Sequence, residues 1–173
     1  MNLIISGTNR LGSNSLKVAN YYKDELLRKG QQWEILSLED LPQDTLFSDL
    51  YGKRSDAFAS IQAKVSDAQK FIFVIPEYNG SYPGALKIFI DACAYPISFY
   101  HKKAALVGVA TGKYGNIRGV DHFTGVCNYL RMQVLSLKIH VPHIKDELDN
   151  DGLFVEPITR AFIDEQIEEI IRF

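Results

Sequence analysis

Five short apolar segments, separated by longer amphipathic stretches, constrain the fold of this chain more than any other feature of its sequence. The segments are Leu3–Ser6, Trp33–Leu38, Phe71–Ile75, Ala104–Ala110 and Val134–Val141. Four of them are almost continuously apolar, which is typical of strands that are buried on both faces of a parallel sheet. The second segment alternates more, as expected of a strand near the edge of a sheet.

The stretches between these segments have the periodicity of amphipathic helices. The first carries apolar side chains at one-turn spacing from Leu16 to Leu26 and ends at Gly30, a residue type that commonly terminates helices. Residues 41–54 show no clear pattern and are expected to form a loop with local turns. The other predicted helices cover residues 55–68, 83–90, 120–130 and 158–171.

Strands that alternate with helices form a parallel sheet with helices on both faces, because each crossover connection is right-handed. The sequence therefore predicts an α/β fold, a three-layer sandwich around a five-stranded parallel sheet. A length of 173 residues suits one core, so we expect residues 1–173 to form a single domain.

Composition excludes several functional classes. The formal net charge is −2 with no cluster of Lys or Arg, which argues against nucleic-acid binding. No uncharged stretch approaches the length of a membrane span, and Met1–Ser6 lacks the features of a signal peptide. Cys93 and Cys127 belong to no CxxC pair and are expected to be reduced thiols. We therefore expect a cytoplasmic protein that binds neither membranes nor nucleic acid.

Three loops follow predicted strands and are rich in Gly, Ser, Thr or Asn. They cover residues 6–15, 76–83 and 111–116. In open α/β sheets, ligands bind beyond the carboxyl ends of the strands, where such loops meet. We therefore expect these three loops to border one binding crevice.

The first loop runs directly into a helix, and the unpaired N–H groups of a helix start favour an anion. Hydroxyl groups and the Arg10 guanidinium add direct hydrogen bonds to a phosphate. A purely structural alternative makes Ser13 or Asn14 a simple N-cap. The candidate phosphate-binding residues are Ser6, Thr8, Arg10, Ser13, Asn14 and Ser15.

The type of phosphate follows from what this loop lacks. Gly7 and Gly12 have the spacing of a nucleotide-triphosphate loop, but Ser13 stands where that loop needs Lys. The GxGxxG fingerprint of dinucleotide sites is also absent, and Glu39 after the second segment is weak support for one. A monophosphate fits best, and FMN is the common monophosphate cofactor of such folds.

The second loop and the helix after it carry the most specific motif of the chain. With this motif the sequence resembles the NADPH-dependent FMN reductase family of the flavodoxin-like fold, which includes flavin, quinone, chromate and azo-dye reductases. The matching positions are Pro76, Glu77, Tyr78, Asn79, Ser81, Pro83, Gly84, Leu86, Lys87 and Asp91, and more loosely Ser6, Arg10, Ser13 and Ser15.

This resemblance implies a flavodoxin-like FMN-binding domain with strand order 2-1-3-4-5. It implies an oxidoreductase that takes reducing equivalents from NADPH or NADH through FMN to a small electron acceptor such as a flavin or quinone. No catalytic side chain is required, because the cofactor carries the hydride chemistry. Family members usually associate through helices beside the flavin, so we expect a homodimer or homotetramer, with the aromatic stretch 95–100 as a candidate contact surface or site wall.

The resemblance also assigns roles in the second and third loops. The second loop is expected to hold the flavin ring through its backbone, with the Tyr78 ring against the flavin; alternatively, Glu77 is a surface charge and Tyr78 covers the core. The third loop departs from the glycine-rich run of the family at Lys113 and Tyr114, which leaves the choice between NADH and NADPH open. The candidate cofactor-binding residues are Pro76, Glu77, Tyr78, Asn79, Gly80, Ser81, Thr111, Gly112 and Tyr114.

Two alternatives from other functional classes stay open: a flavodoxin-like electron carrier, and a family member that binds FMN without turnover. The first is disfavoured because such carriers are usually markedly acidic. His140 and His143 lack acidic or Cys partners, so no metal site is expected. Lys87 and Asp91 are one turn apart and are expected to pair on a helix surface.

Overall fold

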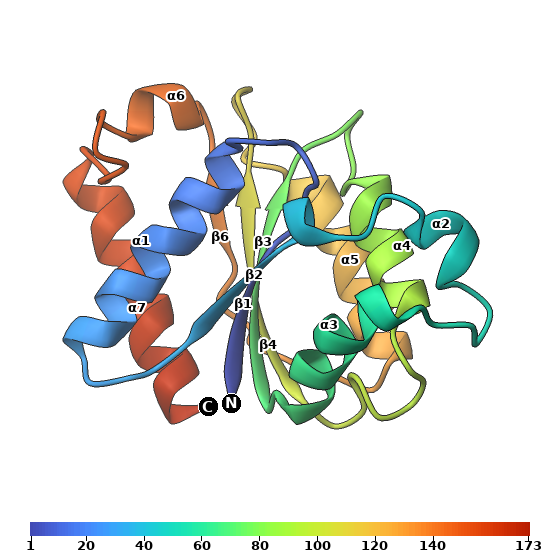
Figure 1. Ribbon diagram of the computed structural model, residues 1–173. Helices are drawn as coiled ribbons and strands as arrows, with labels where there is room; N and C mark the ends of the chain where they lie inside the picture. The colour runs from blue at the N-terminus through green and yellow to red at the C-terminus, as the bar shows by residue number, and fades with distance from the viewer.

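One parallel sheet runs through the middle of the protein and separates two layers of helices (Figure 1). The computed structural model describes all residues from 1 to 173. Its strands are β1 (Asn2–Ser6), β2 (Glu34–Ser37), β3 (Lys70–Pro76), β4 (Lys103–Val109), β5 (Gln133–Val134) and β6 (Ile139–Val141). The order across the sheet is β2-β1-β3-β4-β5 and every pairing is parallel, which confirms the predicted fold class and the position of the second strand at an edge.

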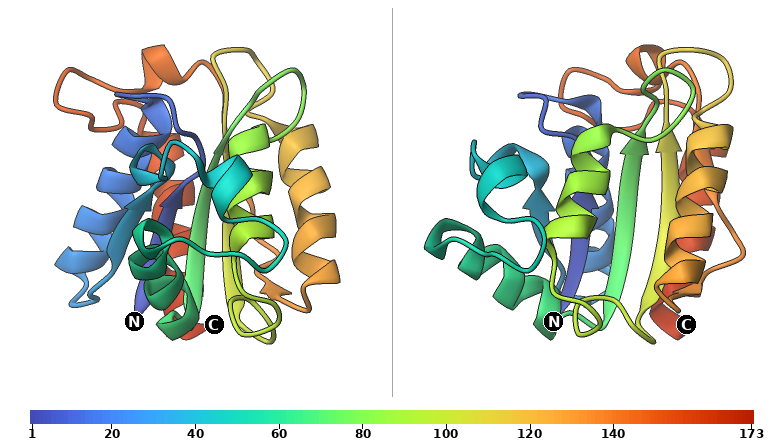
Figure 2. Two further views of the ribbon diagram at one scale, coloured as in Figure 1. Left: turned by 45° about the vertical axis from the view of Figure 1, so that its right-hand side comes forward. Right: turned by 90° about the vertical axis from the view of Figure 1, so that its right-hand side faces the viewer.

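The helices cover the sheet unequally. On one face lie α1 (Asn14–Arg28) and α7 (Pro157–Arg172); on the other lie α3 (Asp56–Asp67), α4 (Gly84–Ala92) and α5 (Ile117–Tyr129) (Figures 1 and 2). The short elements are η1 (Leu38–Asp40), α2 (Thr45–Ser48) and α6 (Ile144–Glu147). The loop expected over residues 41–54 contains only the single turn of α2. No helix combines the length and the apolar character that crossing a membrane requires.

Alternate strand residues supply the two cores. In β1, Leu3 and Ile5 pack on the side of α3, α4 and α5, whereas Ile4 packs on the side of α1 and α7. In β3, Phe73 and Val74 divide in the same way. Because both faces of these strands are buried, their sequences are continuously apolar, as the sequence pattern predicts.

The helix ends follow local sequence signals. The Ser13 hydroxyl accepts a hydrogen bond from the Leu16 amide and caps the start of α1. After α1, Gly30 has a φ of 75°, and the amide of Gln31 donates to the carbonyl of Leu26, which closes the helix as the sequence predicts.

The fifth strand differs from the sequence prediction because it is broken. The predicted strand 134–141 is divided into β5, which pairs with the start of β4, and β6, which pairs with its end. At the break, the buried side chain of Gln166 in α7 makes hydrogen bonds in place of the missing strand backbone. Its Nε2 donates to the carbonyl oxygens of Leu106 in β4 and Leu137 in the break, at 3.1 and 2.9 Å, and its Oε1 accepts from the Tyr22 hydroxyl at 2.8 Å.

The loops that follow β1, β3 and β4 all leave the sheet at the edge formed by the carboxyl ends of the strands, at the top of Figure 1. The two chain termini lie at the opposite edge, at the bottom of Figure 1. Parallel pairing requires this arrangement, because the carboxyl ends of all parallel strands point the same way. A binding site is therefore expected at the carboxyl ends of the strands, at the top of Figure 1.

Replacing Gln166 with Leu is expected to lower the free energy of unfolding by about 3 kcal/mol, because the buried Leu106 carbonyl, the partly buried Leu137 carbonyl and the buried Tyr22 hydroxyl lose their partner. Urea denaturation followed by circular dichroism measures this loss. Tyr22→Phe removes only the hydroxyl and is the matched control, with an expected loss of about 1 kcal/mol. Equal stability of Gln166→Leu and the wild type would contradict the structural role of this side chain.

Candidate functional site

A cavity of about 560 Å³ opens at the carboxyl ends of β1, β3 and β4. This volume is typical of sites for small molecules and cofactors. Parts of all three predicted loops border it, together with a segment that follows β6. The lining residues are Thr8, Arg10, Leu11, Gly12, Ser13, Asn14, Ser15, Pro76, Glu77, Tyr78, Val109, Ala110, Thr111, Ile144 and Lys145.

Two buried hydroxyl groups without protein partners flank the loop between β1 and α1, one at the end of β1 and one at the start of α1. Ser6 and Ser15 are 0% and 1% exposed, and neither Oγ atom has a hydrogen-bond partner. Buried polar groups are normally hydrogen-bonded, so the orphaned hydroxyl of Ser15, which lines the cavity, indicates a polar ligand. Ser13 differs, because its hydroxyl caps α1. The N-cap alternative is therefore correct for Ser13, while the amides of Asn14 and Ser15 stay free, as the first amides of a helix are.

Glycine is required at position 7, where the loop begins. The Gly7 amide donates to the Val74 carbonyl of β3 at 2.9 Å. A Cβ atom on Gly7 would lie 2.8 Å from the same carbonyl oxygen, which is closer than a carbon atom can approach without movement of the backbone. The loop is therefore tied closely to the sheet at its first residue.

One hydrogen bond joins the first loop to the second. Thr8 Oγ1 lies 3.1 Å from the Tyr78 hydroxyl, and the same Oγ1 accepts from the Arg10 amide at 3.3 Å. Thr8 is buried and Tyr78 is 38% exposed, so the tyrosine ring retains an accessible face beside the cavity.

Residues Tyr78 to Ser81 form a tight hairpin. The Tyr78 amide donates to the Ser81 carbonyl, the Ser81 amide donates back, and Asn79 and Gly80 have φ angles of 51° and 75°. These positive angles are those of a type I′ turn, for which Asn-Gly is the preferred sequence. Since the Glu77 amide donates to the carbonyl of Val109, the amides of this segment without a protein acceptor are those of Asn79 and Gly80.

Helix α5 supports this hairpin from behind. Ser81 Oγ lies 2.9 Å from His122 Nδ1, and the Arg118 guanidinium packs against Gly80, 3.1 Å from the position that a Cβ atom would take. The hairpin is thus held by Thr8 on one side and by α5 on the other.

The third loop reaches the cavity only at Thr111. The Gly112 carbonyl accepts from the His143 amide at 3.1 Å. Tyr114 is 60% exposed, with the Lys113 ammonium 4.8 Å from the centre of its ring. Buried Asn116 fixes the end of this loop, because its Nδ2 donates to the Ile75 carbonyl at 2.9 Å.

The structure therefore brings most of the sequence-predicted site residues together, but not all. Those that line the cavity are Thr8, Arg10, Ser13, Asn14, Ser15, Pro76, Glu77, Tyr78 and Thr111. Ser6 lies buried at the end of β1, next to the loop. The predicted residues outside the lining, in addition to Ser6, are Asn79, Gly80, Ser81, Gly112 and Tyr114.

Sequence reasoning missed the contribution of the segment after the fifth strand. Ile144 and Lys145 line the cavity, as do Leu11, Gly12, Val109 and Ala110 from the predicted loops and strand end. A signal for the first two was present, because any chain that leaves a parallel strand at its carboxyl end reaches the same edge of the sheet.

Charged and reactive groups are unevenly distributed around the cavity. Arg10 and Lys145 supply positive charge, and Glu77 supplies one carboxylate. The thiols lie elsewhere, and burial raises the pKa of Cys127 to about 12 and raises that of Cys93 as well. No group of three or more His, Cys, Asp or Glu side chains is arranged to hold a metal ion.

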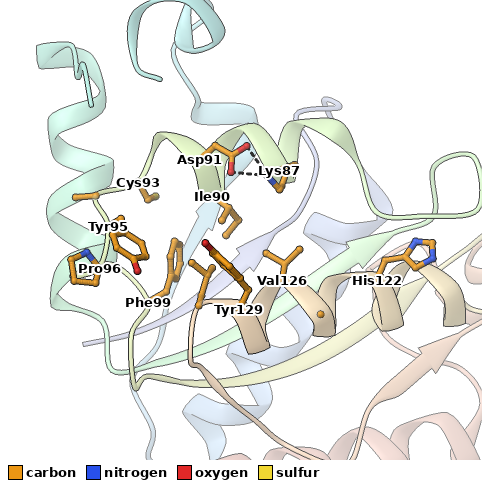
Figure 3. Close-up of a pocket in the computed structure, with 13 residues that line it drawn as sticks. Lys87, Ile90, Asp91, Cys93, Tyr95, Pro96, Phe99, His122, Val126 and Tyr129 are labelled. Carbon is orange, nitrogen blue, oxygen red and sulfur yellow. Dashed lines mark hydrogen bonds and ion pairs between the residues drawn. The ribbon is translucent and has the colours of Figure 1, made fainter. Parts of the chain in front are cut away.

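A second hollow, of about 500 Å³, lies between α4 and α5 and is mainly apolar (Figure 3). Tyr95 and Tyr129, at its rim, are 67% and 79% exposed. Lys87 and Asp91 pair across one turn of α4 at 2.8 Å, as predicted from the sequence. The α4–α5 groove is defined by Ile90, Tyr95, Phe99, Val126, Tyr129 and Leu130.

Comparisons with known proteins agree with this geometry. Residues 2–146 match the family described as NADPH-dependent FMN reductase. A 2-hydroxy-1,4-benzoquinone reductase of Burkholderia sp is 29% identical over 60% of this chain, and the match spans only 59% of that protein's length. An NAD(P)H-dependent FMN reductase of Pseudomonas aeruginosa is 26% identical, with 96% of this chain and 90% of that protein covered.

Among solved structures, the flavoenzyme NAD(P)H:(acceptor) oxidoreductase FerB of Paracoccus denitrificans has the same fold. The TM-score is 0.81, at 19% identity, with 99% of this chain and 94% of that chain covered.

Gly7→Ala is expected to lower the free energy of unfolding by about 1–3 kcal/mol, because the new methyl group must displace the Val74 carbonyl or the loop. Thermal denaturation checks this, and Gly84→Ala is the control. A Cβ atom on Gly84, at the start of α4, meets nothing within 4 Å, so this variant should be at least as stable as the wild type. If the two variants were equally stable, the close approach at Gly7 would be unimportant.

Proposed function

The chain belongs to the NADPH-dependent FMN reductase family, and from this premise we propose that it is an FMN-dependent NAD(P)H oxidoreductase with a small oxidised acceptor. The observation that carries the proposal is the buried, unpartnered hydroxyl of Ser15, which lines the cavity in the first turn of α1; Ser6, whose buried hydroxyl also has no partner, lies next to the loop. The Ser15 hydroxyl and the free amides of α1 are donors suited to a phosphate monoester.

The phosphate of FMN fits the end of the cavity formed by the loop between β1 and α1. Donors there are the amides of Asn14 and Ser15, the Ser15 hydroxyl and the Arg10 guanidinium, which forms forked hydrogen bonds with phosphate oxygens. Ser13 contributes indirectly, because its cap fixes the first turn of α1. The Thr8 hydroxyl is already hydrogen-bonded to the Tyr78 hydroxyl and fixes the first two loops relative to each other.

The flavin ring fits the opposite end, between the Pro76–Ser81 segment and the end of β4. The amides of Asn79 and Gly80, which lie outside the cavity lining and directly after Tyr78, are the free donors of this segment, and the exposed face of Tyr78 offers an aromatic surface. Arg118 and His122 keep the hairpin in place from α5, so these donors are fixed before a ligand arrives. Donors held in this way stabilise charge that develops on a bound ring.

Bound FMN supplies the redox chemistry of this family, since a flavin accepts a hydride from a nicotinamide and passes the electrons on. The protein groups bind, orient and shield the cofactor, and no side chain is required as an acid or base. The buried thiols take no part, because burial raises their pKa and keeps them protonated at neutral pH.

Quinones are the first acceptors to test. The Burkholderia relative is named for a benzoquinone and a rice relative for NADPH:quinone oxidoreduction. An NADPH azoreductase of Bacillus sp. is 30% identical over 80% of this chain, which makes azo dyes the second class to test. We place this activity in the cytoplasm, where NAD(P)H is available and where Cys93 and Cys127, both unpaired in the structure, stay reduced.

A titration of the purified protein with FMN, followed by NADPH and then by air, tests the proposal. The flavin absorbance is expected to shift on binding, to bleach with NADPH and to return with oxygen, and turnover is expected with a benzoquinone. NADH is the parallel donor. Binding of FMN without bleaching by either donor would instead favour an electron carrier or a non-catalytic FMN protein, and failure to bind FMN would refute the proposal.

We further propose that the protein is a homodimer, or a tetramer of such dimers, formed through the α4–α5 groove (Figure 3). The groove is apolar and its rim carries two exposed tyrosines, a residue type enriched in protein interfaces. The charges at its edge, Lys87 and Asp91, neutralise each other. Gly125 on α5 leaves open space above the helix, which lets a second copy approach closely.

Light scattering after gel filtration tests this association. We expect a mass of at least twice the 19.6 kDa of one chain. Gly125→Arg adds a long charged side chain in the groove from a position where a Cβ atom meets nothing within 4 Å, so it should yield a folded monomer. The control, Asn128→Arg, changes an exposed α5 residue outside the groove and should leave the mass unchanged. A monomeric wild type at micromolar concentration would refute the interface.

A further inference from the structure

Lys145 lines the same cavity as the phosphate-binding candidates, although it lies far from them in the sequence. It is the second residue of α6, which follows the carboxyl end of β6. In Figure 1, α6 lies at the upper edge of the molecule beside the start of α1. The chain thus brings a second cation, besides Arg10, to the cavity from the opposite end of the sequence.

The backbone next to Lys145 is anchored firmly. The Ala110 amide donates to the Val141 carbonyl at 3.0 Å, and the Ile144 amide donates back to the Ala110 carbonyl at 3.0 Å. The Ile144 side chain is 1% exposed and packs in the core between the sheet and α1 and α7. Lys145 therefore projects from a segment that is hydrogen-bonded to the residue after β4, and not from a loose surface loop.

Lys145 has no acidic partner within the protein. No carboxylate oxygen lies within 4.0 Å of its ammonium group, although Asp146 and Glu147 follow it directly. The only carboxylate in the cavity lining is that of Glu77, in the loop where the ring of the cofactor fits. The charge of Lys145 is thus available to a ligand at the cavity.

The charge of the proposed ligand requires more than Arg10 supplies. A phosphate monoester carries nearly two negative charges at neutral pH. The hydroxyl of Ser15 and the free amides of α1 are dipoles, and Arg10 provides one full charge. Lys145 is the second full positive charge that borders this cavity.

We propose that Lys145 neutralises the second charge of the FMN phosphate, and that this charge makes the protein select FMN over riboflavin, which has the same ring without the phosphate. The inference rests on the proposed function, since it assigns a residue to the same cofactor site. Lysine acts here as a compact point charge, complementary to the forked hydrogen bonds of Arg10.

Fluorescence titrations with FMN and with riboflavin test the assignment on the whole protein. In Lys145→Gln, the dissociation constant for FMN should rise about tenfold, as the loss of a charged hydrogen bond predicts, while that for riboflavin should stay unchanged. Lys145→Arg restores the charge and should retain most of the affinity for FMN. Lys17→Gln removes another exposed cation, in the first turn of α1 but outside the cavity, and should match the wild type.

The outcomes distinguish the role of Lys145 from the proposed function. Unchanged FMN affinity in Lys145→Gln, or equal losses for FMN and riboflavin, would overturn the role of Lys145 while the wild-type titration still supports the cofactor. An equal loss of FMN affinity in Lys17→Gln would also overturn it, because the loss would then reflect the overall electrostatic potential around the cavity and not a contact between Lys145 and the phosphate. A wild type that binds neither flavin would refute the proposed function itself, and the inference with it.

Discussion

Parallel pairing of β1, β3 and β4 is the constraint on which the rest of this protein depends. The register places Ser6 beside Val74, and Val74 beside Val107, so the three strands leave the sheet at the same edge, the one formed by their carboxyl ends. Their loops must then share the space above that edge, and the cavity forms where they meet. The hydrogen bond from the Gly7 amide to the Val74 carbonyl extends this pairing one residue past the strand and fixes where the first loop begins.

The loops are then joined to one another by side chains. The Thr8 hydroxyl contacts the Tyr78 hydroxyl, and the backbones of Tyr78 and Ser81 pair with each other in the hairpin. The Ser81 hydroxyl in turn contacts the His122 ring of α5. His122 also lines the α4–α5 groove. A continuous series of contacts therefore runs from the phosphate end of the cavity to the surface that we propose as an interface. A ligand in the cavity and the association of two copies would therefore both act on the hairpin of residues 78–81.

The sequence predicted those features that rest on local patterns. Continuous apolar runs revealed the buried strands, and the motif from Pro76 to Lys87 carries the resemblance to the family in the sequence itself. Contacts between distant segments left no such pattern. The division of the fifth strand depends on Gln166, and a single glutamine in a helix does not reveal that it will replace strand backbone. Lys145 was missed although it follows a predicted parallel strand, because its place at the cavity depends on how the segment after β6 folds against β4.

The broken strand has a consequence for how the protein behaves among its neighbours in solution. An edge strand with a long row of free amides and carbonyls is a template on which other chains can add and aggregate. Here the edge beyond β4 is two short pieces, and Gln166 donates hydrogen bonds to the carbonyls of Leu106 in β4 and Leu137 in the break. Lys138, at the end of the break, adds a charge that pairs with Asp121 at 3.9 Å. The irregular edge thus gives an incoming strand no continuous register to follow.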